Sequence, residues 1–376
     1  MKHSGQIYAC AVALALAVIV TNSAQAAPKK TLGYIIPSWL TAMYETKYYD
    51  ECPDGLAIGN DELWWKGLSP MDRDRLTNSG AIEPVDPPRR PMSVLRGPNK
   101  EDVCWMPEVV KDPALRVVKG KLGYGLNLDG TPDGAATANT CKHEKFTTPD
   151  GKAKVDNQMY RLLGCIYGWR KGEYVESHAD RERRDSSVGM ILIEVSDVDD
   201  EQNDPDVKVS FHATRDVLFK DATGKILPYA SYRPSETPHY NTVARGKIVD
   251  GKLITEPTDA RLPLYAHQMT GTMFIKGLRL ELPVAAKDDG TPAMGMMAGY
   301  HDFDNWWEYI RRIESVLVTG QWSCPAVYVA AKELADGYPD PQTGKCTAIS
   351  TAMNIEALPA FIIHSAVKTA RAGEQR

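Results

Sequence analysis

About six strand-like segments follow one another between residues 190 and 300, with no helix-like segment between them. They are 190–195, 207–211, both arms of a hairpin at 242–255, 272–284 and 294–300. The hairpin has a strong turn signal in Asp250–Gly251. Parallel neighbours would need long crossover connections, which are usually helices, so we expect antiparallel pairing. The sequence therefore predicts a mainly-β protein with flanking α segments, built on an antiparallel sandwich or jelly-roll-like core.

The rest of the chain divides around this β-sandwich core, which we place at residues 187–300. Residues 27–125 form an irregular N-terminal region with short helices, one of which begins after the capping residue Ser69. Residues 126–186 combine a polar loop with a helix. Residues 301–376 are expected to form a helical region packed on the core, with Trp306 and Trp307 on the apolar face of its first helix.

The N-terminus has the pattern of a signal peptide, which we place at residues 1–26. Tyr8–Val20 is a run of apolar or small residues that is too short to span a membrane, and Ala24-Gln25-Ala26 is an A-x-A cleavage site. We therefore expect a periplasmic or secreted protein that begins at Ala27 and has no transmembrane span after cleavage.

Cleavage would remove Cys10 and leave an even number of cysteines: Cys52, Cys104, Cys141, Cys165, Cys324 and Cys346. An even count in an oxidising compartment predicts that all of them form disulfides. Six cysteines allow fifteen pairings, and the sequence does not choose among them. Pairing of nearest neighbours would join Cys52 to Cys104, Cys141 to Cys165, and Cys324 to Cys346. The chain has no C-x-x-C motif, which disfavours zinc ribbons and thioredoxin-type dithiols.

Charge and motifs disfavour several classes of function. The formal net charge is −5, so no overall basic field would attract nucleic acid. The sequence has no G-x-G-x-x-G or Walker motif, which disfavours nucleotide binding, and no G-x-S-x-G motif for a serine nucleophile. The histidines are dispersed and show no H-E-x-x-H or H-x-H spacing.

Two features are candidate binding sites. Trp64 and Trp65 lie in a less regular segment, where their rings could stack on a sugar. The second feature is the acidic loop 197–206, whose oxygen-rich side chains suit calcium although the spacing is not that of an EF-hand. The calcium ligands that we expect there are Asp197, Asp199, Asp204 and Asp206.

These observations favour an exported, non-catalytic ligand-binding protein, whose ligand is a small molecule or a glycan. The alternative is a secreted hydrolase of glycans or esters that uses dispersed carboxylates or histidines. A hydrolase requires a pocket with two titratable groups in reach of the same bond. A binding protein should show a shallow aromatic strip without such a pair, and a structural or assembly component should show neither.

Overall fold

The computed structural model describes residues 29–80, 97–285, 290–313 and 322–364. It confirms the mainly-β prediction, because an eleven-stranded sheet dominates the protein and a few helices flank it. The strands of this sheet are β1 (Lys30–Thr41), β4 (Met190–Val198), β5 (Asp204–Thr214), β6 (Ala230–Tyr232), β7 (Thr242–Val249), β8 (Lys252–Thr255), β9 (Thr258–Ala266), β10 (Met269–Pro283), β11 (Ala293–Asp302), β12 (Gly337–Pro339) and β13 (Cys346–Ile362). Two short strands, β2 (Phe146–Thr147) and β3 (Lys154–Val155), pair separately.

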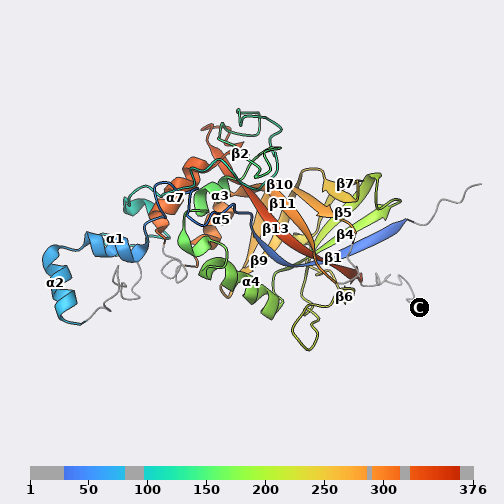
Figure 1. Ribbon diagram of the computed structural model, residues 1–376, viewed down its shortest axis with the longest axis horizontal. Helices are drawn as coiled ribbons and strands as arrows, with labels where there is room; N and C mark the ends of the chain where they lie inside the picture. The colour runs from blue at the N-terminus through green and yellow to red at the C-terminus, as the bar shows by residue number, and fades with distance from the viewer. Residues whose placement is uncertain (1–28, 81–96, 286–289, 314–321, 365–376) are drawn as a thin grey trace, which may run out of the picture.

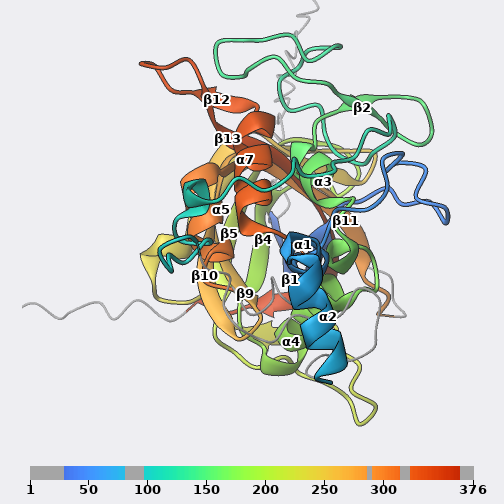
Figure 2. The ribbon, with the colours of Figure 1, turned by 90° about the vertical axis from the view of Figure 1, so that its left-hand side faces the viewer.

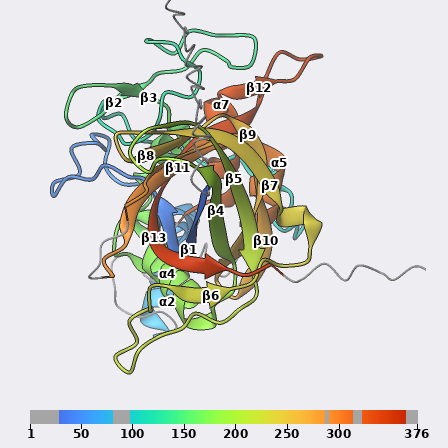
Figure 3. The same ribbon diagram turned by 90° about the vertical axis from the view of Figure 1, so that its right-hand side faces the viewer.

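The large sheet closes on itself through its first and last long strands. Neighbours pair in the order β1-β4-β5-β7-β8-β10-β11-β13, and β13 also pairs with β1. All pairings around this ring are antiparallel, whereas the short β6 is parallel to β13. Figure 3 shows the strands curling around a common axis. Both edges of β1 are therefore hydrogen bonded, and the ring closes without a free edge there.

The main hydrophobic core lies inside this curled sheet, where opposite walls pack together as the layers of a sandwich do. Its buried side chains come from strands all around the ring and include Ile36 in β1, Ile193 in β4, Phe211 in β5, Leu280 in β10 and Ile355 in β13. The alternating pattern of β5 and the hairpin turn between β7 and β8 are both as predicted. Asp250 and Gly251 have φ angles of 50° and 73°, as a two-residue hairpin turn requires.

The sequence did not predict β9 or the short strands β2, β3, β6 and β12, and two long strands, β1 and β13, lie in regions where no sheet was expected. β1 lies in the N-terminal region that we expected to be irregular, and Pro37 interrupts its strand pattern. The structure accommodates Pro37 because the β1–β13 register shifts between Ile35 and Ser38, and bulges tolerate a missing donor. β13 lies in the C-terminal region 301–376, which we expected to be helical. The expectation holds only for the part of this region that contains the helices at 303–310 and 324–334. Most of β13 is buried on both faces, which removes the alternation that marks a strand.

The helices gather at one end of the sheet, and α1 and α2 project farthest from it (Figure 1). Figure 2 views the protein from this helical end. The helices are α1 (Asn60–Gly67), α2 (Pro70–Asn78), α3 (Gln158–Leu163), α4 (Tyr174–Ser186), α5 (Phe303–Ile310) and α7 (Cys324–Leu334), with 3-10 turns η1 (Pro107–Val109), η2 (Tyr167–Trp169) and η3 (Pro238–Tyr240). Ser69 caps α2 through its side chain, as predicted, and Asp302 caps α5 in the same way.

A second hydrophobic core joins α3, α5 and α7. Trp306 and Trp307 of α5 are buried in it, which confirms their predicted packing role, and they lie beside Leu162 of α3 and Val327 of α7. All residues of α3 are buried. This core fixes the helical end against the sheet through Ile349 of β13.

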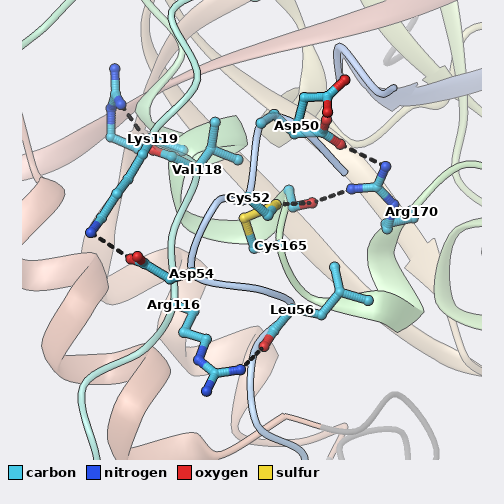
Figure 4. The surroundings of a disulfide bond; sticks show 12 residues. Asp50, Cys52, Asp54, Leu56, Arg116, Val118, Lys119, Cys165 and Arg170 are labelled. Carbon is cyan, nitrogen blue, oxygen red and sulfur yellow. Dashed lines mark hydrogen bonds and ion pairs between the residues drawn. A yellow bond between two sulfur atoms is a disulfide. The ribbon is translucent and has the colours of Figure 1, made fainter. Parts of the chain in front are cut away.

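All six described cysteines form disulfides, as predicted. The pairs are Cys52–Cys165, Cys104–Cys324 and Cys141–Cys346, so none of the nearest-neighbour pairs forms. Each bond joins segments more than a hundred residues apart, because the fold brings distant segments together at the helical end. Around Cys52, Lys119 pairs with Asp54 at 2.5 Å and Arg116 donates to the Leu56 carbonyl at 2.9 Å (Figure 4).

Three disulfides indicate that the protein folds in an oxidising environment outside the cytoplasm. The predicted signal peptide lies outside the described residues. In the described part of the chain, none of the helices is both long and apolar enough to cross a membrane.

Candidate functional site

The predicted sugar-stacking pair, Trp64 and Trp65, lies on the projecting helix α1. Both residues are half-buried, and their ring centroids lie 6.1 Å apart with a 50° angle between the planes. They do not form one flat platform, and neither lines the groove described below. Stacking of a ligand on these rings stays a prediction.

The predicted calcium loop holds its carboxylates apart. Asp199 pairs with Lys29 at 3.3 Å, and Asp206 pairs with Arg245 of β7. Asp204 instead accepts backbone hydrogen bonds from Asp199 and Asp206, at 2.7 and 3.1 Å, which shape the loop. No three carboxylates of this fully described loop, Asp197 included, bring oxygens within 4.8 Å of one another. Calcium binding would require these side chains to leave their partners and turn toward one point.

The structure gathers charged side chains in the polar loop 127–156 instead. Lys145 places its Nζ 2.5 Å from Asp129 Oδ1, 2.7 Å from Asn127 Oδ1 and 3.0 Å from Asp156. Its side chain is only 2% exposed, and those of Asp129 and Asp156 are fully buried. An ammonium group therefore occupies a cage of oxygens, in the way that a bound cation would.

His143 extends this arrangement toward the sheet. Its Nε2 lies 2.8 Å from Asp156 Oδ1 and 3.8 Å from Asp336, which lies between α7 and β12. Asp336 also accepts a hydrogen bond from the Ser350 backbone N–H of β13 at 2.6 Å. We call Asp129, His143, Lys145, Asp156 and Asp336 the buried charge network. It fixes the polar loop to the sheet beside the Cys141–Cys346 disulfide.

Two groups of the buried charge network have strongly perturbed pKa values. Burial opposes the charged form of His143, but the hydrogen bond to Asp156 and the charge of Asp336 outweigh it and raise the pKa of His143 to about 9. Burial raises the pKa of Asp336 to about 6, against the nearby charge of His143. These groups have little solvent access, so the network holds the fold and offers no place for a ligand.

An open groove with a volume of about 670 Å³ lies where α4 ends beside β5, η3 and the β9–β10 hairpin. Its lining combines apolar side chains such as Val188, Val217 and Leu264 with Arg215. Val217 is 70% exposed, so its aliphatic side chain is accessible to a ligand. Most of the remaining polar lining consists of hydroxyl groups, from Ser186, Ser187, Thr214, Ser235, Thr237, Tyr240, Thr270 and Thr272.

Four of these hydroxyl groups already accept a hydrogen bond from the backbone. Backbone N–H groups donate to the hydroxyl oxygens of Ser186, Ser187, Thr214 and Ser235. A hydroxyl that accepts in this way keeps its own hydrogen available for another acceptor. With Arg215, they give the groove a surplus of donors. The Tyr240 ring adds an amphipathic aromatic surface, and its hydroxyl lies 3.1 Å from Thr272 Oγ1.

The groove lacks the paired groups of a hydrolase. Its described lining contains no aspartate or glutamate. The contact between His239 Nε2 and Thr272 Oγ1 is 3.4 Å, longer than the separation of about 2.6–3.2 Å between a nucleophile and its base, and no lining carboxylate is present to orient His239.

A second groove, of about 650 Å³, does have carboxylates, namely Glu108, Asp304, Glu333 and Asp340. The first three are exposed, and hydrogen bonds from Thr343 hold the pKa of Asp340 below its usual value. A general acid of a glycosidase needs a raised pKa instead, so this geometry gives the hydrolase alternative little support.

Sequence reasoning missed both the groove and the buried charge network. The groove lining comes from segments between residues 186 and 272 that meet only after the sheet has closed. The network has a local signal, because Asp129, His143, Lys145 and Asp156 lie within one loop, but Asp336 is distant in sequence. No family model matches the chain, and neither curated proteins nor solved structures gave a significant match.

Proposed function

We propose that this protein is an exported, non-catalytic binding protein whose ligand occupies the groove beside the end of α4. The observation that carries the proposal is the donor-rich lining, in which hydroxyl groups and Arg215 surround exposed aliphatic side chains and no carboxylate is present. Such a surface suits a small molecule or glycan with many acceptor oxygens, including an acidic sugar. The Tyr240 ring supports recognition of an apolar sugar face.

The three disulfides and the A-x-A motif at Ala24–Ala26 support export to the periplasm or secretion after removal of residues 1–26. N-terminal sequencing of exported material should give Ala27 as the first residue. Material that still carries Met1 would contradict this part of the proposal.

The ligand proposal is tested by calorimetric titration of the oxidised protein with neutral oligosaccharides, uronic-acid oligosaccharides and small carboxylic acids. Arg215→Ala and Thr272→Val should each weaken binding of the ligand, because both remove groove donors. Arg75→Ala, on the exposed face of the distant helix α2, should leave binding unchanged. Weaker ligand binding by Trp64→Ala would show that α1 also contacts the ligand. Binding that survives both groove variants would contradict the groove as the site.

The same samples separate binding from hydrolysis. Incubation with each glycan, followed by chromatography of the products, should show intact ligand. Cleavage that Asp304→Asn or Glu333→Gln abolishes would replace the binding proposal with a hydrolase in the second groove.

A further inference from the structure

Three potential metal ligands meet beside α4, outside the groove lining. His178 and Glu182 lie one turn apart on α4, and His178 Nδ1 is 3.5 Å from Glu182 Oε1. His267 comes from the turn between β9 and β10. One ligand atom from each of the three side chains lies within 4.8 Å of the other two. The side chains of His178 and Glu182 are 24% and 14% exposed, so an ion can reach them from solvent.

The two imidazoles have few polar partners. The Val175 backbone interacts with His267, and Glu182 lies beside His178. Their rings stack at 5.4 Å with an angle of 5°, and Tyr174 lies against both. Within the described residues, neither ring nitrogen of His267 makes a hydrogen bond of good geometry, and neither does Nδ1 of His178. Buried polar atoms without partners are costly, which calls for an explanation of their placement.

The backbone holds His267 in place at an energetic cost. His267 and Gln268 have φ angles of 53° and 62°, in the left-handed region that favours glycine or asparagine in a two-residue turn. The Gln268 N–H donates to Glu182 Oε2 at 3.2 Å, which orients the carboxylate and leaves Oε1 toward His178. Strained residues of this kind cluster at functional sites.

We propose that His178, Glu182 and His267 form a binding site for a divalent transition metal of the zinc class. Two imidazole nitrogens and one carboxylate oxygen are a preferred ligand set for Zn²⁺, whereas Ca²⁺ and Mg²⁺ prefer oxygen alone. Three protein ligands leave a fourth position for water or another ligand. Tetrahedral bonds of about 2.0–2.2 Å need ligand atoms about 3.4 Å apart, so metal binding requires the side chains to move inward and the two stacked rings to turn until their nitrogens face one ion.

The cysteine thiols and the carboxylates of the buried charge network are already engaged elsewhere. Thiolate ligands are not available, because all six described cysteines are in disulfides. Asp129, His143 and Asp156 also lie close together, but the Lys145 ammonium already neutralises their carboxylates.

Zinc titration of the disulfide-bonded protein, without a polyhistidine tag, tests the site by calorimetry. The wild type should bind one Zn²⁺ per chain. His178→Phe keeps a ring for the stack but removes both nitrogens, and His267→Asn suits the left-handed turn. Each should weaken zinc binding by at least about 100-fold, and Glu182→Gln by at least about tenfold. His239→Ala, in the groove and outside the cluster, should bind zinc as the wild type does. Bound Co²⁺ should show visible d–d absorption that His178→Phe abolishes.

Two results would overturn the metal site. One is the absence of saturable one-to-one zinc binding in the folded wild type, which would show that the rings only pack against each other. The other is zinc binding that persists in His178→Phe and His267→Asn, particularly if Asp129→Asn abolishes it. Because no groove ligand is present in this titration, failure here leaves the proposed function of the groove untouched.

Discussion

Replacing Lys145 by methionine removes an ammonium group from a buried cage of oxygens and keeps most of the aliphatic stem. The variant leaves the side chains of Asp129 and Asp156 buried without the ammonium group that contacts both of them. Removing one member of a buried ion pair costs about 3–5 kcal/mol, because the other charge stays desolvated. Unfolding entropy of about 2.1 cal/mol/K per residue gives about 0.7 kcal/mol/K for about 350 residues. The expected loss is therefore about 4–7 °C in the unfolding midpoint.

Lys121→Met is the matched control. Lys121 pairs with Glu144 at 2.8 Å, a distance comparable to the Lys145 contacts, but these side chains are 70% and 68% exposed. A pair in solvent contributes less than about 1 kcal/mol, so its loss should shift the midpoint by about 1 °C or less. Calorimetry of both variants at pH 7 under oxidising conditions gives the comparison.

A double variant tests the cause of the loss. Adding Asp129→Asn to Lys145→Met removes one of the stranded charges, so the double variant should be less destabilised than the sum of the single variants by at least about 1 kcal/mol. Equal midpoints for Lys145→Met and Lys121→Met, or strictly additive effects, would refute the reasoning.

Three further predictions follow from the described contacts. The raised pKa of His143, about 9, means that protonated His143 stabilises the fold fully below about pH 6.5 and that this contribution is lost as pH rises through 9. The free energy of urea unfolding should therefore fall between pH 6.5 and 9.5 in the wild type and fall less in His143→Gln. An equal fall in both proteins would contradict this prediction. Mass spectrometry of unreduced peptides should find the pairs Cys52–Cys165, Cys104–Cys324 and Cys141–Cys346 and no alkylatable thiol, and a peptide that joins nearest neighbours would contradict the pairing. Replacing both Cys141 and Cys346 by serine should lower the free energy of unfolding by about 2–5 kcal/mol. If calcium binds the loop 197–206, a hundredfold excess over Kd should stabilise the protein by about 2.7 kcal/mol and raise its unfolding midpoint by about 4 °C. Replacing Asp197 and Asp199 by asparagine should abolish this rise, and a midpoint that is the same with and without chelator would contradict calcium binding.

Local patterns in the sequence were sufficient to predict the central strands, the hairpin turn and the helix caps. The sequence of β5 alternates because Val207, Val209 and Phe211 point into the main core, and Ser69 and Asp302 form caps within their own helix turns. β1 and β13 escaped prediction for a different reason. Pro37 interrupts the strand pattern of β1, and burial on both faces removes the alternation of polar and apolar residues from β13. Only their pairing in the closed sheet identifies them as strands.

The candidate sites depend even more on tertiary structure. His178 and Glu182 have the four-residue spacing that places ligands on one helix face, but His267 is 85 residues beyond Glu182. The hydroxyl groups of the groove are common surface residues in the sequence, and only their convergence distinguishes them. Disulfide pairing follows the same rule, because proximity along the chain did not determine which cysteines meet.

The pairing of β1 with β13 sets the order in which this protein can fold. In a chain that folds from its N-terminus, β1 is available long before β13, so the edges of β1 and β11 that pair with β13 stay unpaired until residues 346–362 are available. Cys104 and Cys141 likewise wait for partners 220 and 205 residues later, while other thiols are nearer in the growing chain. Oxidation before these partners are available favours non-native bonds, which must then exchange before the native pairs can form. The topology therefore favours forming the disulfides and closing the sheet only after the whole chain is available.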